Sequence, residues 1–229
     1  MLTQTIRTGS LGHAADRQSR AVPAPVSHPL LGSIEMMGAP MSFGRNAEIY
    51  GEGEPADYLY KVVSGAVRTS KILADGRRQI GAFYVPGDIF GLEAGDEHTF
   101  SGEAIVETKV LVIKRSALVG RAARDNDLAR QLWALTGCEL ARVQGHVLLL
   151  IKTAQERVAG FLLEMADRAP NGDAVELSMS RQDIADYLGL TIETVSRTLT
   201  GLESAATIAL PSSRLVVLRN RAALRQMNA

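Results

Sequence analysis

Residues 181–202 read RQDIADYLGLTIETVSRTLTGL, and this stretch decides the fold of the C-terminal part of the chain. Ile184 and Leu188 are spaced so that they share one face of a helix. Gly189 permits a backbone turn that a side chain would obstruct, and Thr191 is a suitable N-cap for a second helix. The stretch therefore predicts two short amphipathic helices joined by a tight turn, a helix-turn-helix.

The second of these helices has two chemically different faces. Its buried stripe is predicted to be Val195, Leu199 and Leu202. The opposite face carries Ile192, Glu193, Ser196 and Arg197. An arginine fork matches the O6/N7 edge of guanine, and a glutamate can accept from the cytosine amine, so this face suits a G·C pair. A glutamate and an arginine four residues apart also occur on ordinary solvent-exposed helix faces, where they form a simple ion pair. We expect Glu193 to pair with Arg197 and to orient its guanidinium.

The residues of this stretch also resemble a known family. RQDIADYLGLTIETVSR is similar to the helix-turn-helix of the CRP/FNR family of bacterial transcription regulators. Its ETVSR segment resembles the E-x-x-S-R reading motif of the FNR and FixK branches. The resemblance implies that Glu193 and Arg197 contact a G·C pair, with Ser196 and Ile192 on thymine edges. We expect Thr191 and Arg181 to contact DNA as well.

The helix-turn-helix is flanked by further predicted elements. Thr153 and Glu156 form a capping-box pattern before a helix, and Ser180 is a suitable cap for the first helix of the motif. Residues 208–218 read as two short strands around a Pro-Ser-Ser turn, a β-hairpin wing. Arg214 lies near the tip of this hairpin, where it suits a contact with a DNA phosphate. An arginine that only faces solvent would be equally compatible with the sequence.

Composition limits what kind of protein this is. The 229 residues contain 25 Lys or Arg and 25 Asp or Glu, so DNA binding has to come from a local patch. Residues 214–229 offer one, with four arginines and no acid. The only cysteine, Cys138, excludes an intrachain disulfide and fits a reducing cytoplasm. The sequence has no signal-peptide or transmembrane pattern, which predicts a cytoplasmic protein with no membrane partner.

Short apolar runs separated by Gly, Pro and Asp occupy residues 29–126 and predict strands of a sandwich or barrel. They resemble the double-stranded β-helix, or jelly roll, of the cyclic-nucleotide-binding domain that the family shares. Ala74-Asp75-Gly76 predicts a hairpin turn. By family analogy we expect Asp75 and Arg77 in this hairpin to contact RNA polymerase. Residues 1–28, poor in large apolar side chains, are predicted to be a flexible or weakly helical arm, with a partner-binding tail as the alternative.

The stretch that would hold a cyclic-nucleotide phosphate lacks a cation. Residues 91–104 contain Glu93, Asp96, Glu97 and Glu103 but no Arg or Lys, so an anion would be repelled. The R-S phosphate pair of the cAMP-responsive branch is absent, and so are the N-terminal cysteines of FNR. We therefore expect neither cAMP nor an iron–sulfur cluster, and no other cofactor or metal. His98 among these acids is interpreted as part of a solvated acidic turn rather than a metal ligand.

A long helix is predicted at residues 127–151, where neither Pro nor a polar cluster interrupts the chain. Six of its residues recur at alternating three- and four-residue steps, the a/d pattern of a two-stranded coiled coil: Trp133, Thr136, Leu140, Val143, Val147 and Leu150. Burial of this stripe within one subunit is one interpretation, and the family resemblance favours the other, in which the stripe joins two copies of the chain. A second stripe, Leu128, Leu132 and Leu135, is predicted to pack back onto the β domain.

Together these patterns predict an α+β chain in four parts: an arm at 1–28, a β-roll at 29–126, a dimerisation helix at 127–151 and a winged helix-turn-helix at 152–229. The resemblance implies a FixK-type homodimer that binds double-stranded DNA at a palindrome with TTGA and TCAA arms, activates transcription through RNA polymerase, and controls genes for low-oxygen respiration or nitrogen fixation. A sensor with an unidentified small molecule in the β-roll remains the alternative. No nucleophile and base lie close in sequence, so an enzyme is not expected.

Overall fold

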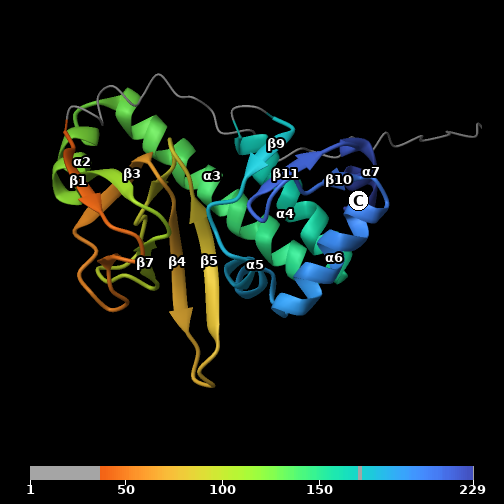
Figure 1. Ribbon diagram of the computed structural model, residues 1–229. Helices are drawn as coiled ribbons and strands as arrows, with labels where there is room; N and C mark the ends of the chain where they lie inside the picture. Colours follow the sequence, from red (N-terminus) through yellow and green to blue (C-terminus); the bar gives the residue numbers. More distant parts are fainter. Residues whose placement is uncertain (1–36, 170–171, 229) are drawn as a thin grey trace, which may run out of the picture.

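The computed structural model describes residues 37–169 and 172–228, and the predicted arm at 1–28 lies outside them. Two four-stranded antiparallel sheets form a roll at the N-terminal side (Figure 1). The first sheet has the order β1 (Ala39–Phe43), β8 (Thr108–Lys114), β3 (Tyr58–Ser64), β6 (Ile89–Phe90). The second has the order β2 (Glu48–Tyr50), β7 (Ser101–Ala104), β4 (Val67–Ile72), β5 (Arg78–Tyr84). The predicted jelly roll is confirmed.

Apolar side chains from both sheets meet inside the roll. Val62, Val67 and Val110 are completely buried there, on strands β3, β4 and β8. The connection from β3 to β4 needs glycine, because Gly65 has φ +88° and a Cβ atom would lie 2.4 Å from the Thr108 hydroxyl. A tight turn at this point lets consecutive strands enter different sheets.

Two helices follow the roll. The first, α2, spans Arg115–Ala122, and the long α3 spans Asn126–Leu150, close to the predicted 127–151. Asp125 caps α3, since its carboxylate accepts from the backbone N–H groups of Asp127 and Leu128 at 3.0 and 3.1 Å. The stripe predicted to pack back does so: Leu128 is buried against the roll, and Leu132 and Leu135 are partly buried beside it.

The C-terminal domain begins after a break in the helical path. Thr153 and Glu156 form the predicted capping box of α4 (Ala154–Arg168). The remaining elements are β9 (Ala174–Glu176), α5 (Arg181–Leu188), α6 (Ile192–Ser204), β10 (Ile208–Ala209), β11 (Leu215–Leu218) and α7 (Arg221–Met227). Strands β10, β11 and β9 form a small antiparallel sheet in that order, which confirms the predicted wing.

One apolar cluster crosses the boundary between the roll and the C-terminal domain. Ile80 and Phe83 of β5 belong to the same buried cluster as Phe161 of α4 and Tyr187 of α5. In Figure 1, α5 lies directly beside β5. The C-terminal domain is therefore held against the roll by shared packing as well as by the chain. No helix within the described residues is both long and apolar enough to cross a membrane.

Candidate nucleic-acid interface

The turn between α5 and α6 has the geometry that the sequence predicts. The Asp183 backbone N–H donates to the Ser180 hydroxyl at 3.0 Å, and the Asp183 carboxylate accepts from the Ser180 backbone N–H at 2.9 Å. This reciprocal capping box starts α5. Gly189 ends the helix with φ +61°, a left-handed conformation that favours glycine.

An arginine that the sequence did not single out closes the same turn. The Arg157 guanidinium on α4 donates to the carbonyl oxygens of Leu188 at 2.8 Å, Gly189 at 3.3 Å and Lys152 at 2.8 Å. These carbonyls lie at helix ends, where they lack intrahelical partners. Arg157 thus ties the start of the C-terminal domain to the helix-turn-helix, and no local sequence pattern signals it, because Leu188 is 31 residues away.

The second helix of the motif buries the predicted stripe. Thr191 caps α6 by accepting from the Thr194 backbone N–H at 3.2 Å. Val195, Leu199 and Leu202 are buried on the side that faces the domain core. Because three consecutive turns of α6 are anchored, the orientation of the opposite face is determined by packing.

That opposite face is open to solvent. Ile192, Glu193, Ser196 and Arg197 are all exposed, as is Thr191 at the helix start. The predicted ion pair between Glu193 and Arg197 is wrong, since the salt bridges of the described residues do not include it. Backbone hydrogen bonding at the helix N-terminus and the Thr191 hydroxyl hold the pKa of Glu193 below its ordinary value, with a smaller effect of Arg197. Within the described chain Arg197 has no hydrogen-bond or ion-pair partner.

The other two predicted DNA contacts lie in different surroundings. One guanidinium nitrogen of Arg181 is fully buried without a hydrogen-bond partner, and burial lowers the pKa of this arginine. Arg214 is exposed beyond the wing turn and donates to the Ser178 carbonyl at 3.3 Å. It lines a cavity of about 260 Å³ between the roll and the C-terminal domain, together with Arg45 and Arg78 of the roll.

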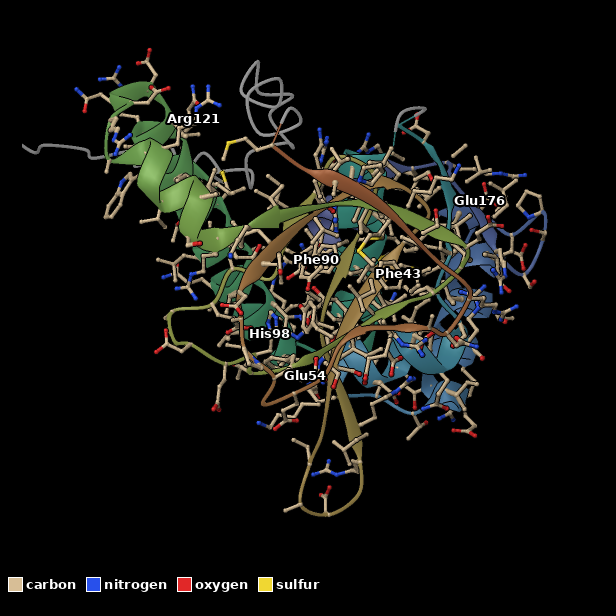
Figure 2. The ribbon with its side chains drawn as sticks, turned by 90° about the vertical axis from the view of Figure 1, so that its left-hand side faces the viewer. Phe43, Glu54, Phe90, His98, Arg121 and Glu176 are labelled. Carbon is tan, nitrogen blue, oxygen red and sulfur yellow. The ribbon has the colours of Figure 1, made fainter. Side chains whose placement is uncertain are left out.

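Aromatic side chains occupy the interior of the roll. Tyr60 stacks on Tyr50 and on Phe90, with ring centroids 5.3 and 5.1 Å apart. Figure 2 shows Phe90 towards the middle of the roll and His98 nearer its edge. The interpretation of His98 as part of a solvated turn is wrong, because its ring is 2% exposed and stacks on Tyr50 at 3.7 Å. Among residues 37–169 and 172–228, no three His, Cys, Asp or Glu side chains are placed to hold a metal ion.

A cation does face the roll, but it comes from α3 rather than from residues 91–104. The Arg142 guanidinium lies 4.5 Å from the centre of the Tyr84 ring, donates to its hydroxyl at 2.8 Å and pairs with Glu139. One turn later His146 stacks on Tyr187 of α5 at 4.1 Å. Burial, and then Arg142, lower the pKa of His146 to about 4. An anion in the roll would have to displace Glu139 from Arg142.

The stripe predicted to join two chains is open along most of its length. Trp133 is 82% exposed, and Thr136, Leu140, Val143 and Val147 are exposed too. Leu150 is only half-exposed and lies beside Gly189 of the helix-turn-helix, whereas its neighbour Ile151 is 80% exposed. The apolar stripe therefore ends on Ile151 rather than on Leu150.

The hairpin between β4 and β5 extends away from the rest of the roll (Figure 1). Its turn is the predicted one, with Gly76 at φ +82°. Asp75 accepts from the Arg77 side chain at 2.6 Å, and both side chains are more than half exposed. Hydrogen bonds from Arg77 lower the pKa of Asp75. The two residues expected to meet RNA polymerase thus form an ion pair that is accessible to a partner.

A roll, a long helix and a winged helix-turn-helix with an open recognition face define a DNA-binding transcription regulator. Residues 40–125 match the cyclic nucleotide-binding domain, and residues 156–227 match the Crp-like helix-turn-helix domain. The chain belongs to the CRP/FNR family of transcription regulators and, within it, is of the FixK type.

Individual relatives support that assignment. The nitrogen fixation regulation protein FixK of Azorhizobium caulinodans is 53% identical over 224 residues, covering 95% of this chain and 87% of the relative. FixK of Rhizobium meliloti is 42% identical and covers 90% of each chain. The structure of FixK2 from Bradyrhizobium japonicum has a TM-score of 0.81 at 52% identity, covering 84% of this chain and 98% of that one. Both FixK relatives are named as regulation proteins, not as enzymes.

Proposed function

We propose that the protein is a homodimeric transcriptional activator that reads a palindrome through α6 and controls genes for low-oxygen respiration or nitrogen fixation. The observation that carries the proposal is the exposed face of α6, where Arg197 has no partner within the described residues while the opposite face is anchored in the core. A free guanidinium on a rigid helix is suited to the O6/N7 edge of guanine. Glu193 accepts from the cytosine of the same pair, and Ser196 and Ile192 contact thymines.

The remaining predicted contacts position the domain on the DNA. Thr191 at the start of α6 and Arg214 at the wing contact phosphates, which orient a protein without reading sequence. Arg181 contributes only if its guanidinium turns out of its buried position. Two copies joined along α3 present two α6 helices, so the target is a palindrome with half-sites about one helical turn apart. The FixK relatives favour TTGA and TCAA arms.

Replacement of Arg197 by alanine tests the reading face. Arg197→Ala should weaken binding to the TTGA/TCAA palindrome by about 1–3 kcal/mol per half-site and relax the preference at the G·C pair. Arg121→Ala is the matched control, because Arg121 lies on α2 at the far end of the molecule (Figure 2). Equal affinity of Arg197→Ala and the parent, measured by fluorescence anisotropy at one fixed salt concentration, would refute the assignment.

We further propose that the protein works in the cytoplasm without cAMP. Arg142 is already paired with Glu139, and residues 91–104 contain no Arg or Lys, so a cyclic phosphate held by this stretch would lack a free guanidinium. Isothermal titration with cAMP should show no binding in the micromolar range. Micromolar affinity would refute this part of the proposal.

A second candidate is a regulator that senses an apolar small molecule. A groove of about 600 Å³ opens on the roll, and its lining includes Met41, Phe43, Tyr58, Tyr60 and Lys114. Such a lining favours an apolar ligand with an acidic group. Native mass spectrometry of freshly purified protein distinguishes the two: a stoichiometric bound metabolite supports the sensor, and a mass equal to that of two chains with nothing bound supports the effector-free regulator.

Activation requires contact with RNA polymerase, and we assign it to Asp75 and Arg77. Their hairpin extends from the roll, and the two side chains hold each other in place. Charge reversal at Asp75 should lower transcription in vitro while DNA affinity stays unchanged. Full transcription by the Asp75→Arg and Arg77→Asp variants would reject the assignment.

A further inference from the structure

The roll and the DNA-binding domain are joined by a cluster of buried charges that has no counterpart in the sequence patterns. We propose that Arg68 and Arg78 of the roll are positioning residues for DNA recognition: by gripping α5 they set the orientation of α6, and so the spacing of half-sites that the dimer accepts. This inference rests on the proposed reading of a palindrome by α6. The cluster comprises Arg68, Arg78, Glu103, Asp183 and Asp186, and we call it the interdomain cluster.

Asp183 is its centre. One carboxylate oxygen accepts from the backbone N–H and the hydroxyl of Ser180, at 2.9 and 2.8 Å, and caps α5. The other oxygen accepts from Arg78 at 2.6 Å and from Arg68 at 3.2 Å. The Asp183 side chain is only 4% exposed, so salt and water screen these contacts weakly. One carboxylate thus links the start of α5 to two strands of the roll.

Arg78 contacts a second carboxylate of α5, that of Asp186. Its guanidinium donates to Asp186 at 2.8 Å while it also holds Asp183, one helical turn earlier. Two contacts three residues apart define the direction of a helix as well as its distance. Gln182 donates to the other oxygen of Asp186 at 2.6 Å and keeps that carboxylate in place.

The Arg68 side chain is ordered by contacts within the roll. Glu103 lies opposite Arg68 on the neighbouring strand β7 and accepts from it twice, at 2.9 and 2.6 Å. The arginine is therefore ordered by the roll alone, and it loses little conformational entropy when Asp183 arrives. A preordered cation favours one docked orientation of α5 over its neighbours.

The orientation of α5 determines that of α6, because the two helices pack against each other. Ile184 and Leu188 of α5 and Val195 of α6 belong to one buried cluster, which also contains Ile80 of β5. Close-packed interiors transmit displacement, so α6 cannot rotate independently of α5. In this way the charges beside β5 determine where the exposed face of α6 points.

Variants on the roll side test the proposal, because they leave the capping of α5 intact. Arg78→Gln and Arg68→Gln should each weaken binding to the palindrome by about tenfold or more, as expected when a buried ion pair loses one partner. Binding to a single isolated half-site should change by less than about threefold. Palindromes lengthened or shortened by one base pair should be discriminated less by the variants than by the parent. Lys71→Gln is the matched control, since Lys71 on β4 pairs within the roll with Glu52 at 2.7 Å.

Reversal and conservation of the charge at position 78 supply an independent readout. Arg78→Asp should lose palindrome binding, because it places a third carboxylate beside Asp183 and Asp186, whereas Arg78→Lys, which keeps a cation there, should retain most of it. If the parent binds the palindrome but both glutamine variants keep its affinity and spacing preference, the positioning role is wrong and the proposed function stands. A parallel loss on isolated half-sites would also overturn it. Failure of the parent to prefer the palindrome would instead refute the proposed function.

Discussion

At the scale of single residues, the conformation of Gly189 decides whether the two helices of the motif can meet. Its φ of +61° is unfavourable for other residues, and a Cβ atom would lie 3.4 Å from the Arg157 guanidinium. We expect Gly189→Ala to lower the free energy of unfolding by about 1–2 kcal/mol, measured by urea denaturation. Gly201→Ala in α6 is the control, because it has open space and an ordinary helical backbone, and should stabilise by about 0.5–1 kcal/mol. Equal effects of the two substitutions would contradict this account.

The exposed face of α6 shows which features residue spacing can predict and which it cannot. Periodicity alone placed Glu193 and Arg197 on the exposed side of α6, which is where they lie. Periodicity did not predict that the first turn of α6 would affect the Glu193 carboxylate more than Arg197 does. The helix N-terminus and the Thr191 hydroxyl lower the pKa of Glu193 more than Arg197 does. Arg197 is consequently left free, which strengthens its candidacy as the base-reading residue.

At the scale of elements, α3 is the proposed contact between two copies of the chain. Its exposed apolar stripe costs free energy in water, and a second α3 would cover it. Leu140→Glu places a charge at the centre of the stripe and should shift the protein from dimer to monomer in sedimentation equilibrium, with loss of palindrome binding. Ala134→Glu, on an exposed position outside the a/d pattern, should leave the dimer intact. A Leu140→Glu protein that remains dimeric would exclude α3 as the seam.

At the scale of the whole molecule, the interdomain cluster makes stability depend on pH. Burial alone would raise the pKa of Asp183, but Ser180, Arg68 and Arg78 outweigh it, and the net effect lowers it below 3.8. Its contribution is therefore fully present above the unfolded pKa and is lost as pH falls through the lower folded value. We expect Asp183→Asn to cost about 2–3 kcal/mol of unfolding free energy at pH 7.

That cost should stay constant down to about pH 5 and shrink as the pH falls below about 4, because the carboxylate is then protonated in the unfolded chain first and in the folded protein only at lower pH. Urea unfolding of the parent and the variant across this range measures the difference. Asp127→Asn serves as the control, because Asp127 pairs with Arg130 on the open surface, and an exposed pair contributes little at any pH. A cost at pH 3 as large as at pH 7 would rule out the charge of Asp183 as its cause.

The sequence by itself determined the features whose causes lie within a few residues: the caps at Thr153, Ser180 and Thr191, the left-handed turn at Gly189, the hairpin at Asp75, and the two stripes of α3. Each depends on local hydrogen bonding or on helical and strand periodicity. Only the tertiary structure decided how the roll meets the DNA-binding domain. Arg68 and Asp183 are 115 residues apart, and Arg142 faces the roll from a different element. Such pairs depend on which buried surfaces dock, and packing of that kind leaves no periodic trace along the chain.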